Sequence, residues 1–130
     1  MRIFSICLCL VYAVAQSAIA QTAPKPAIVG MKAMPVAVTA GSYQLINQVI
    51  DVPPGAAIPR HTHGGPAVVT MVSGALVVTD AKGTRTLKAG QTFTEPTGYV
   101  HAVANKGSIP ARVSVSYLIP KGAQVTTMVK

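Results

Sequence analysis

Residues 90–105 read GQTFTEPTGYVHAVAN, and this stretch carries the strongest fold signal in the chain. A β-favouring run, 92–95, is followed by Pro96-Thr97-Gly98. Proline cannot donate to a strand ladder, and glycine adopts turn conformations that other residues avoid, so this tripeptide marks a tight turn. The stretch therefore predicts two short strands joined by a turn that brings His101 to the start of the second strand.

Short apolar runs separated by Gly- and Pro-rich turns continue on both sides of this stretch. We expect strands at 32–39, 43–52, 67–73, 75–79, 84–88, 92–95, 100–104 and 112–118. Turn signals spaced by about eight to twelve residues favour a β-sandwich or β-barrel. No segment carries a convincing helical period, so the predicted fold class is all-β.

Length and charge restrict the range of functions. The chain has 130 residues, enough for one domain, and a formal net charge of +8. The basic residues are scattered with few aromatic residues between them, so we expect no nucleic-acid partner. The charge either attracts anions generally or serves only solubility, and the sequence leaves both open.

The N-terminal segment differs from the rest of the chain. Arg2 precedes the apolar stretch 3–15, and Ala18-Ile19-Ala20 places small residues where a signal peptidase cleaves. We predict a signal peptide over 1–20, a flexible lead-in over 21–30 and one domain over 31–130. The mature protein would then be secreted or periplasmic and would meet a membrane only through the signal peptide. The alternative is an uncleaved anchor, although the apolar stretch is shorter than the usual span of about 20 residues.

Three histidines form the candidate metal site. His61 and His63 are two residues apart on an extended segment, and side chains at i and i+2 share one face of a strand. His101 begins another strand. Neutral imidazole is a good ligand for Zn, Fe, Cu and Ni. We therefore predict a divalent metal ion (Fe, Zn, Mn, Cu or Ni) bound by His61, His63 and His101.

The frame around these histidines resembles two motifs of the cupin superfamily. Gly55, His61-Thr62-His63 and Gly74 resemble the first motif; Gly90, Pro96-Thr97-Gly98, His101 and Asn105 match the second motif at every anchor. The resemblance covers residues 53–105. It implies a cupin-type jelly-roll β-barrel of antiparallel strands, here in a small secreted single-domain protein, with a metal site in the barrel mouth.

One position departs from the family pattern. The first motif usually has a glutamate four residues after the second histidine, and this chain has Ala67 there. The resemblance is then to cupins with three histidine ligands, which include dioxygenases. Three neutral imidazoles would leave a divalent metal with its full +2 charge and with open coordination positions, which favours a small anionic ligand. A degenerate site that does no chemistry remains the alternative.

Glu95 is the other candidate functional residue, and we assign it as the catalytic candidate. It ends the predicted strand before Pro96, where the family usually has an apolar residue facing the barrel. Its carboxylate can orient a metal-bound histidine through the free ring N–H, ligate the metal directly, or act as a general base. The remaining interpretation is an exposed acid at a strand end.

These features favour an enzyme, namely a metal-dependent oxidoreductase of the dioxygenase type acting on a small anionic or enolisable compound. Two other functions stay open. A non-catalytic protein that binds a metal or small ligand agrees with Ala67 and the shortage of acid–base groups. A metal-dependent isomerase or lyase would use Glu95 as its base. A homodimer formed through an edge strand is also compatible with the sequence.

Overall fold

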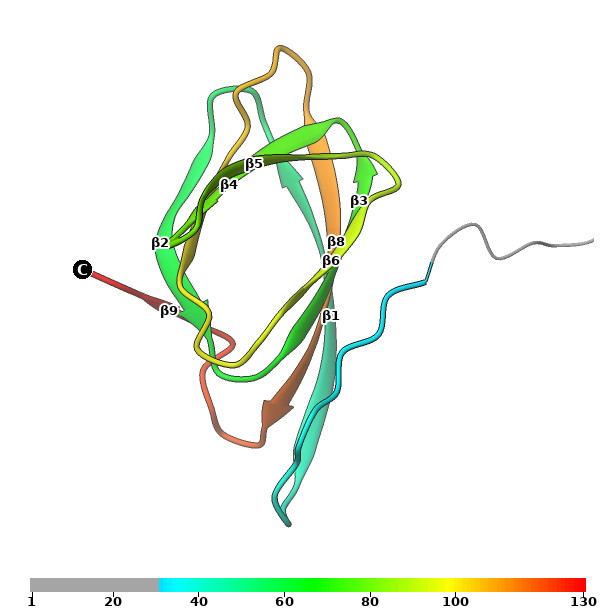
Figure 1. Cartoon of the computed structure of the whole chain (residues 1–130), viewed down its shortest axis with the longest axis vertical. Helices are drawn as coiled ribbons and strands as arrows, with labels where there is room; N and C mark the ends of the chain where they lie inside the picture. Colours follow the sequence, from blue (N-terminus) through cyan, green and yellow to red (C-terminus); the bar gives the residue numbers. More distant parts are fainter. Residues whose placement is uncertain (1–30) are drawn as a thin grey trace, which may run out of the picture.

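The computed structural model describes residues 31–130, which form two facing antiparallel sheets (Figure 1). In spatial order, the first sheet contains β1 (Tyr43–Val52), β8 (Ala111–Pro120), β3 (Ala67–Ser73) and β6 (Thr92–Glu95). The second contains β5 (Gly83–Lys88), β4 (Ala75–Asp80), β7 (His101–Ala104), β2 (Ala57–His63) and β9 (Thr126–Met128). The predicted all-β class with antiparallel strands is confirmed. The predicted signal peptide (1–20) and lead-in (21–30) lie outside the described residues.

The core lies between the two sheets and is built by strand alternation. Every second side chain is buried along β8 and along 67–71 of β3, as expected for strands with one face against a core. Their register pairs Ala67 with Tyr117 and Val69 with Val115. The buried apolar residues are Val52, Ala67, Val69, Met71, Leu76, Val78, Leu87, Ala111, Val113, Val115, Tyr117 and Ile119.

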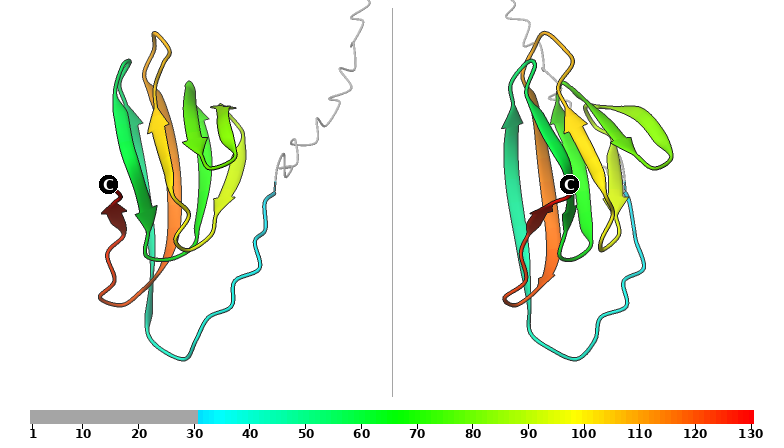
Figure 2. Two further views of the ribbon diagram at one scale, coloured as in Figure 1. Left: turned by 60° about the vertical axis from the view of Figure 1, so that its left-hand side comes forward. Right: turned by 90° about the vertical axis from the view of Figure 1, so that its left-hand side faces the viewer.

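Seven of the eight predicted strands are present, with ends that differ by at most two residues. The predicted strand at 32–39 is wrong, because these residues form no strand and are almost all exposed. They run outside the two sheets, as the cyan segment of Figure 2 shows, and Pro35 has no N–H to donate. The short strand β9 was not predicted, although it pairs with β2 beside the histidines. Within the described part of the chain, no helix is long and apolar enough to cross a membrane.

The turn between β2 and β3 depends on a close approach of two backbones at Gly65. A β-carbon at this position would lie 2.0 Å from the carbonyl oxygen of Leu118 and 3.0 Å from its carbonyl carbon. Leu118 belongs to β8, whose backbone is held on both sides by β1 and β3. Only glycine therefore lets the chain turn directly after His63 and enter β3.

Gly65→Ala is expected to lower the free energy of unfolding by about 2 kcal/mol or more, because overpacked sites cost about 1–3 kcal/mol and here backbone must move. Thermal or urea unfolding measures the change. Gly107→Ala is the control, since its β-carbon would first meet the Asn105 side chain, at 3.3 Å. Equal stability of the two variants would contradict the role of Gly65.

Candidate metal centre

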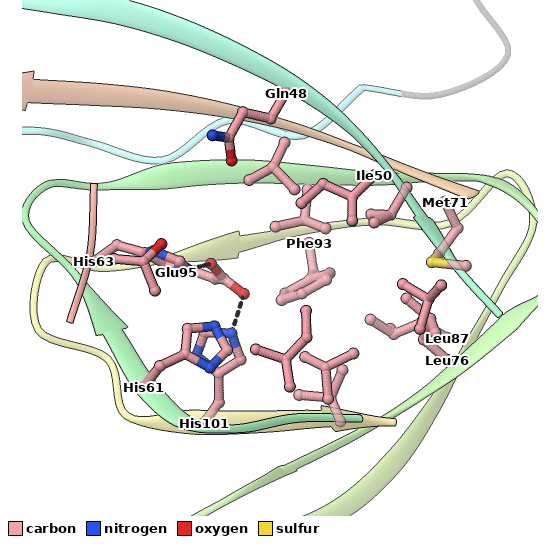
Figure 3. Close-up of a pocket in the computed structure, with 18 of the residues that line it drawn as sticks. Gln48, Ile50, His61, His63, Met71, Leu76, Leu87, Phe93, Glu95 and His101 are labelled. Atoms are coloured by element: carbon pink, nitrogen blue, oxygen red, sulfur yellow. Dashed lines mark hydrogen bonds and ion pairs between the residues drawn. The ribbon is translucent and has the colours of Figure 1, made fainter. Parts of the chain in front are cut away.

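Strand geometry brings the three predicted histidines together. His61 and His63 project from one face of β2, and His101 begins β7, where it pairs with His61. All three side chains are buried, and one nitrogen from each lies within 4.8 Å of the other two. Figure 3 shows the imidazoles gathered on one side of a pocket. The prediction that these rings converge is confirmed.

Backbone carbonyls determine how the rings are oriented. His61 Nδ1 lies 2.7 Å from the Pro59 oxygen, His63 Nδ1 lies 2.9 Å from the Val125 oxygen, and His101 Nδ1 lies 3.3 Å from the Tyr99 oxygen. A carbonyl oxygen only accepts hydrogen bonds, so each Nδ1 carries the proton and donates it. Each Nε2 is therefore the atom free to bind a metal. Such outer contacts are the usual way in which proteins orient histidine ligands.

Glu95 lies on the inner side of this cluster. Its side chain is buried, with the residue 2% exposed, so the interpretation as an exposed strand-end acid is wrong. Its Oε1 lies 3.0 Å from His101 Nε2, and its Oε2 lies 3.3 Å from His63 Nε2 (Figure 3). Oε2 makes no hydrogen bond of good geometry. Glu95 thus faces the Nε2 atoms and not the Nδ1 atoms that backbone carbonyls already hold.

The buried Glu95 carboxylate and the histidine nitrogens around it favour a bound cation between them. Burial opposes ionisation of Glu95, but when His101 and His63 are also protonated on the nitrogens that face it, their hydrogen bonds and charge outweigh burial and lower the Glu95 pKa to about 2. Burial, together with the neighbouring His101 and His63 rings, lowers the pKa of His61, whereas the Glu95 carboxylate raises the pKa of His63 despite its burial. An Nε2 lone pair and a carboxylate oxygen in contact repel each other unless a proton or metal ion lies between them. The donor set of imidazoles plus carboxylate fits a divalent transition metal.

A pocket of about 100 Å³ adjoins the histidines and extends between the two sheets. Its polar lining residues are His61, His63, His101, Glu95, Gln48, Tyr117 and Thr126. All other residues that line it are apolar, and Leu76, Leu87 and Met71 lie at the end away from the histidines (Figure 3). No lysine or arginine of the described chain lines this pocket. It therefore suits a ligand with an apolar body and a single polar end.

Several site residues were not predicted from the sequence. Tyr117 packs against the His63 ring, with 4.9 Å between ring centroids, and burial raises its pKa to about 12, so its phenol stays neutral. Its alternation with Val113 and Val115 was the available signal. The Val125 carbonyl comes from the loop before β9, for which no sequence signal existed. Gln48 is an exposed residue of β1 that also lines the pocket, as do Ile50 and Val52 of the same strand.

The turn that carries His101 is held from outside the pocket. The Tyr99 ring stacks on the His101 ring, with 4.9 Å between centroids and 19° between planes. The Tyr99 hydroxyl donates to the Asp80 carboxylate, which also forms an ion pair with Arg85 at 2.5 Å. Tyr99 is not among the residues that line the pocket. These contacts restrain the orientation of His101.

Comparison with known proteins agrees with this geometry. The model of the cupin domain family matches residues 48–119. A sugar phosphate isomerase of the cupin superfamily from Silicibacter pomeroyi is similar, with 28% identity over 56% of this chain and a TM-score of 0.52. This chain spans about half of that protein, with 49% of it covered. No protein of the curated set matches the chain.

Two further solved structures show the same fold. An uncharacterized protein with a double-stranded β-helix domain from Klebsiella pneumoniae is 24% identical, with 73% of this chain and 90% of that one covered and a TM-score of 0.55. A DMSP lyase from Ruegeria pomeroyi is 20% identical, with 65% and 43% covered and a TM-score of 0.58. The family match spans more than half of the chain. The two antiparallel sheets of the chain and its three buried histidines agree with the resemblance found in the two motifs. The chain belongs to the cupin domain family.

Proposed function

We propose that this chain is an exported, metal-dependent oxidoreductase of the dioxygenase type that acts on a small enolisable compound. The observation that supports a metal-dependent function best is the arrangement of three inward Nε2 atoms beside an apolar pocket. A divalent ion held by His61, His63 and His101 would act there as a Lewis acid and as a template for the substrate. Export rests on the sequence of residues 1–20.

The pocket limits the substrate class. Its volume of about 100 Å³ is smaller than the cavity of about 150 Å³ that accommodates benzene, so the enclosed part of the substrate is small. Because no basic side chain lines the pocket, we expect a compound with one oxyanion or enolate oxygen and an apolar remainder, and not a phosphorylated sugar. Tyr117 and Gln48, which line the pocket, would supply hydrogen bonds to its polar end.

An isomerase or lyase is the second candidate. Glu95 is the only carboxylate that lines the pocket in the described chain, so it would be the base that moves a proton from a substrate. The isomerase and lyase named above share the fold, which agrees with either activity without selecting one. A binding protein without turnover remains the third candidate, because few other acid–base groups line the pocket.

Oxygen uptake separates these candidates. Protein loaded with Fe²⁺, Mn²⁺, Ni²⁺, Cu²⁺ or Zn²⁺ is mixed with small diketones and 2-oxo acids that carry apolar substituents. We expect oxygen to be consumed in proportion to product, and His101→Ala to abolish this consumption. Product formed without oxygen uptake would identify an isomerase or lyase instead. Saturable binding without any product would identify a binding protein.

A further inference from the structure

We infer that Glu95 is a fourth protein ligand of the metal centre, supplied by β6 to a position that β3 leaves empty at Ala67. The inference rests on the proposed metal centre and adds a ligand to it. The register of the sheet carries the first step: Ala67 of β3 pairs directly with Glu95 of β6. Side chains of directly opposed residues emerge on the same face, about 4.5–5.5 Å apart at the β-carbons. The Glu95 carboxylate thus enters the site beside a side chain too short to reach it.

The direction of the carboxylate is the second step. A glutamate that only orients a histidine ligand would bond the ring nitrogen that faces away from the metal. In this site, the carbonyls of Pro59, Val125 and Tyr99 hold all three of those nitrogens. Glu95 approaches the opposite nitrogens, where the metal itself would bind. Its place is therefore among the ligand atoms.

The third step is the spacing of the ligand atoms. Metal–nitrogen and metal–oxygen bonds to Zn²⁺ are about 2.0–2.2 Å long, so neighbouring ligand atoms lie about 3.0 Å apart in an octahedron and about 3.4 Å apart in a tetrahedron. The two contacts of Glu95, 3.0 Å to His101 Nε2 and 3.3 Å to His63 Nε2, fall in this range. The distances from the Glu95 oxygens to the two Nε2 atoms are therefore those expected between neighbouring ligand atoms of one metal ion.

The fourth step is the missing counter-charge. A buried carboxylate is unfavourable unless it is paired or binds a metal. No lysine or arginine of residues 31–130 lines the pocket, and Arg85 pairs with Asp80 outside it. Glu95 Oε2 is buried and lacks a hydrogen-bond donor. A divalent ion supplies the charge that this oxygen lacks.

Direct ligation also changes the charge expected from the sequence. Three neutral histidines would leave the ion with two positive charges, whereas Glu95 reduces the centre to one. One charge suits a monoanionic oxygen at the polar end of the substrate. This agrees with a pocket that offers no further positive side chain.

A cross-strand swap of the carboxylate tests the inference. Co²⁺ affinity is measured by competition with a chelating dye for wild type, Glu95→Ala, Glu95→Gln and the double variant Ala67→Glu/Glu95→Ala, each checked for folding by thermal unfolding. We expect both single variants to bind Co²⁺ at least about 10-fold more weakly, since even outer partners of ligands contribute 10- to 100-fold. The double variant should recover most of this loss, because the carboxylate returns from the paired position. The visible spectrum of bound Co²⁺ should change in Glu95→Gln and return toward wild type in the double variant.

Three results would overturn the inference. The first is a Glu95→Gln variant that binds Co²⁺ with wild-type affinity. The second is a folded double variant that binds Co²⁺ no more tightly than Glu95→Ala does. If the double variant does not fold, an unchanged Co²⁺ spectrum of saturated Glu95→Gln overturns it, and a changed spectrum supports it. These outcomes differ from failure of the proposed function. If His101→Ala loses the metal and Glu95→Gln keeps it with wild-type affinity, the histidine centre stands and only the fourth ligand is wrong. If metal binding depends on Glu95 but no substrate is turned over, the fourth ligand stands and only the proposed enzyme activity is wrong.

Discussion

Replacing His61, His63 or His101 singly by alanine is expected to weaken binding of a divalent metal by at least about 100-fold, the largest effect that we predict. Losing an outer partner of a ligand already costs about 10- to 100-fold, and each of these substitutions removes a ligand atom. Removing His63 or His101 also leaves the buried Glu95 carboxylate with one fewer partner. Metal content after dialysis and a competition titration with Zn²⁺ measure the effect.

Thr62→Val is the matched control for the histidine variants. Thr62 lies between the two histidines on β2, and its hydroxyl has no hydrogen-bond partner, so valine keeps its shape and removes no contact. This variant should keep wild-type affinity. Equal metal content in wild type and all three histidine variants would show that the cluster binds no metal.

Removing the metal is expected to lower the melting temperature by roughly 10–20 °C, the second largest effect. A ligand present at about 100 times its Kd stabilises the folded state by about 2.7 kcal/mol, and about 1 kcal/mol corresponds to about 4–8 °C in a domain of this size. Without the ion, the Glu95 carboxylate faces the ring nitrogens of His63 and His101 without a cation between them. Differential scanning calorimetry with and without a chelator measures the shift.

His101→Ala provides the control for chelation, because a chain that binds no metal should melt at the same temperature with and without the chelator. Its melting temperature should also lie near or below that of chelated wild type. An unchanged melting temperature for wild type after verified removal of the metal would contradict any contribution of the ion to stability.

Short-range sequence patterns accounted for most of the fold. Strand ends were predictable because Pro53-Pro54-Gly55 and Pro96-Thr97-Gly98 stop pairing locally, and the buried face of β3 followed from alternation along 67–73. The strand predicted at 32–39 is absent because local sequence does not show whether a partner strand is available. A β-favouring composition makes a strand only where a partner strand lies alongside, and that depends on residues far away in the chain.

The candidate site divides in the same way. By itself, the sequence determined that His61 and His63 share a face and that the turn at Pro96 delivers His101 to a strand, because both are consequences of local backbone geometry. Only the tertiary structure decided that Glu95 lies opposite Ala67, that the Val125 carbonyl orients His63, and that the pocket has no basic lining. These relations join strands 28 residues or more apart in the numbering, as from 67 to 95, so they depend on sheet register and on the packing of one sheet against the other. No local pattern encodes which side chain faces which across that distance.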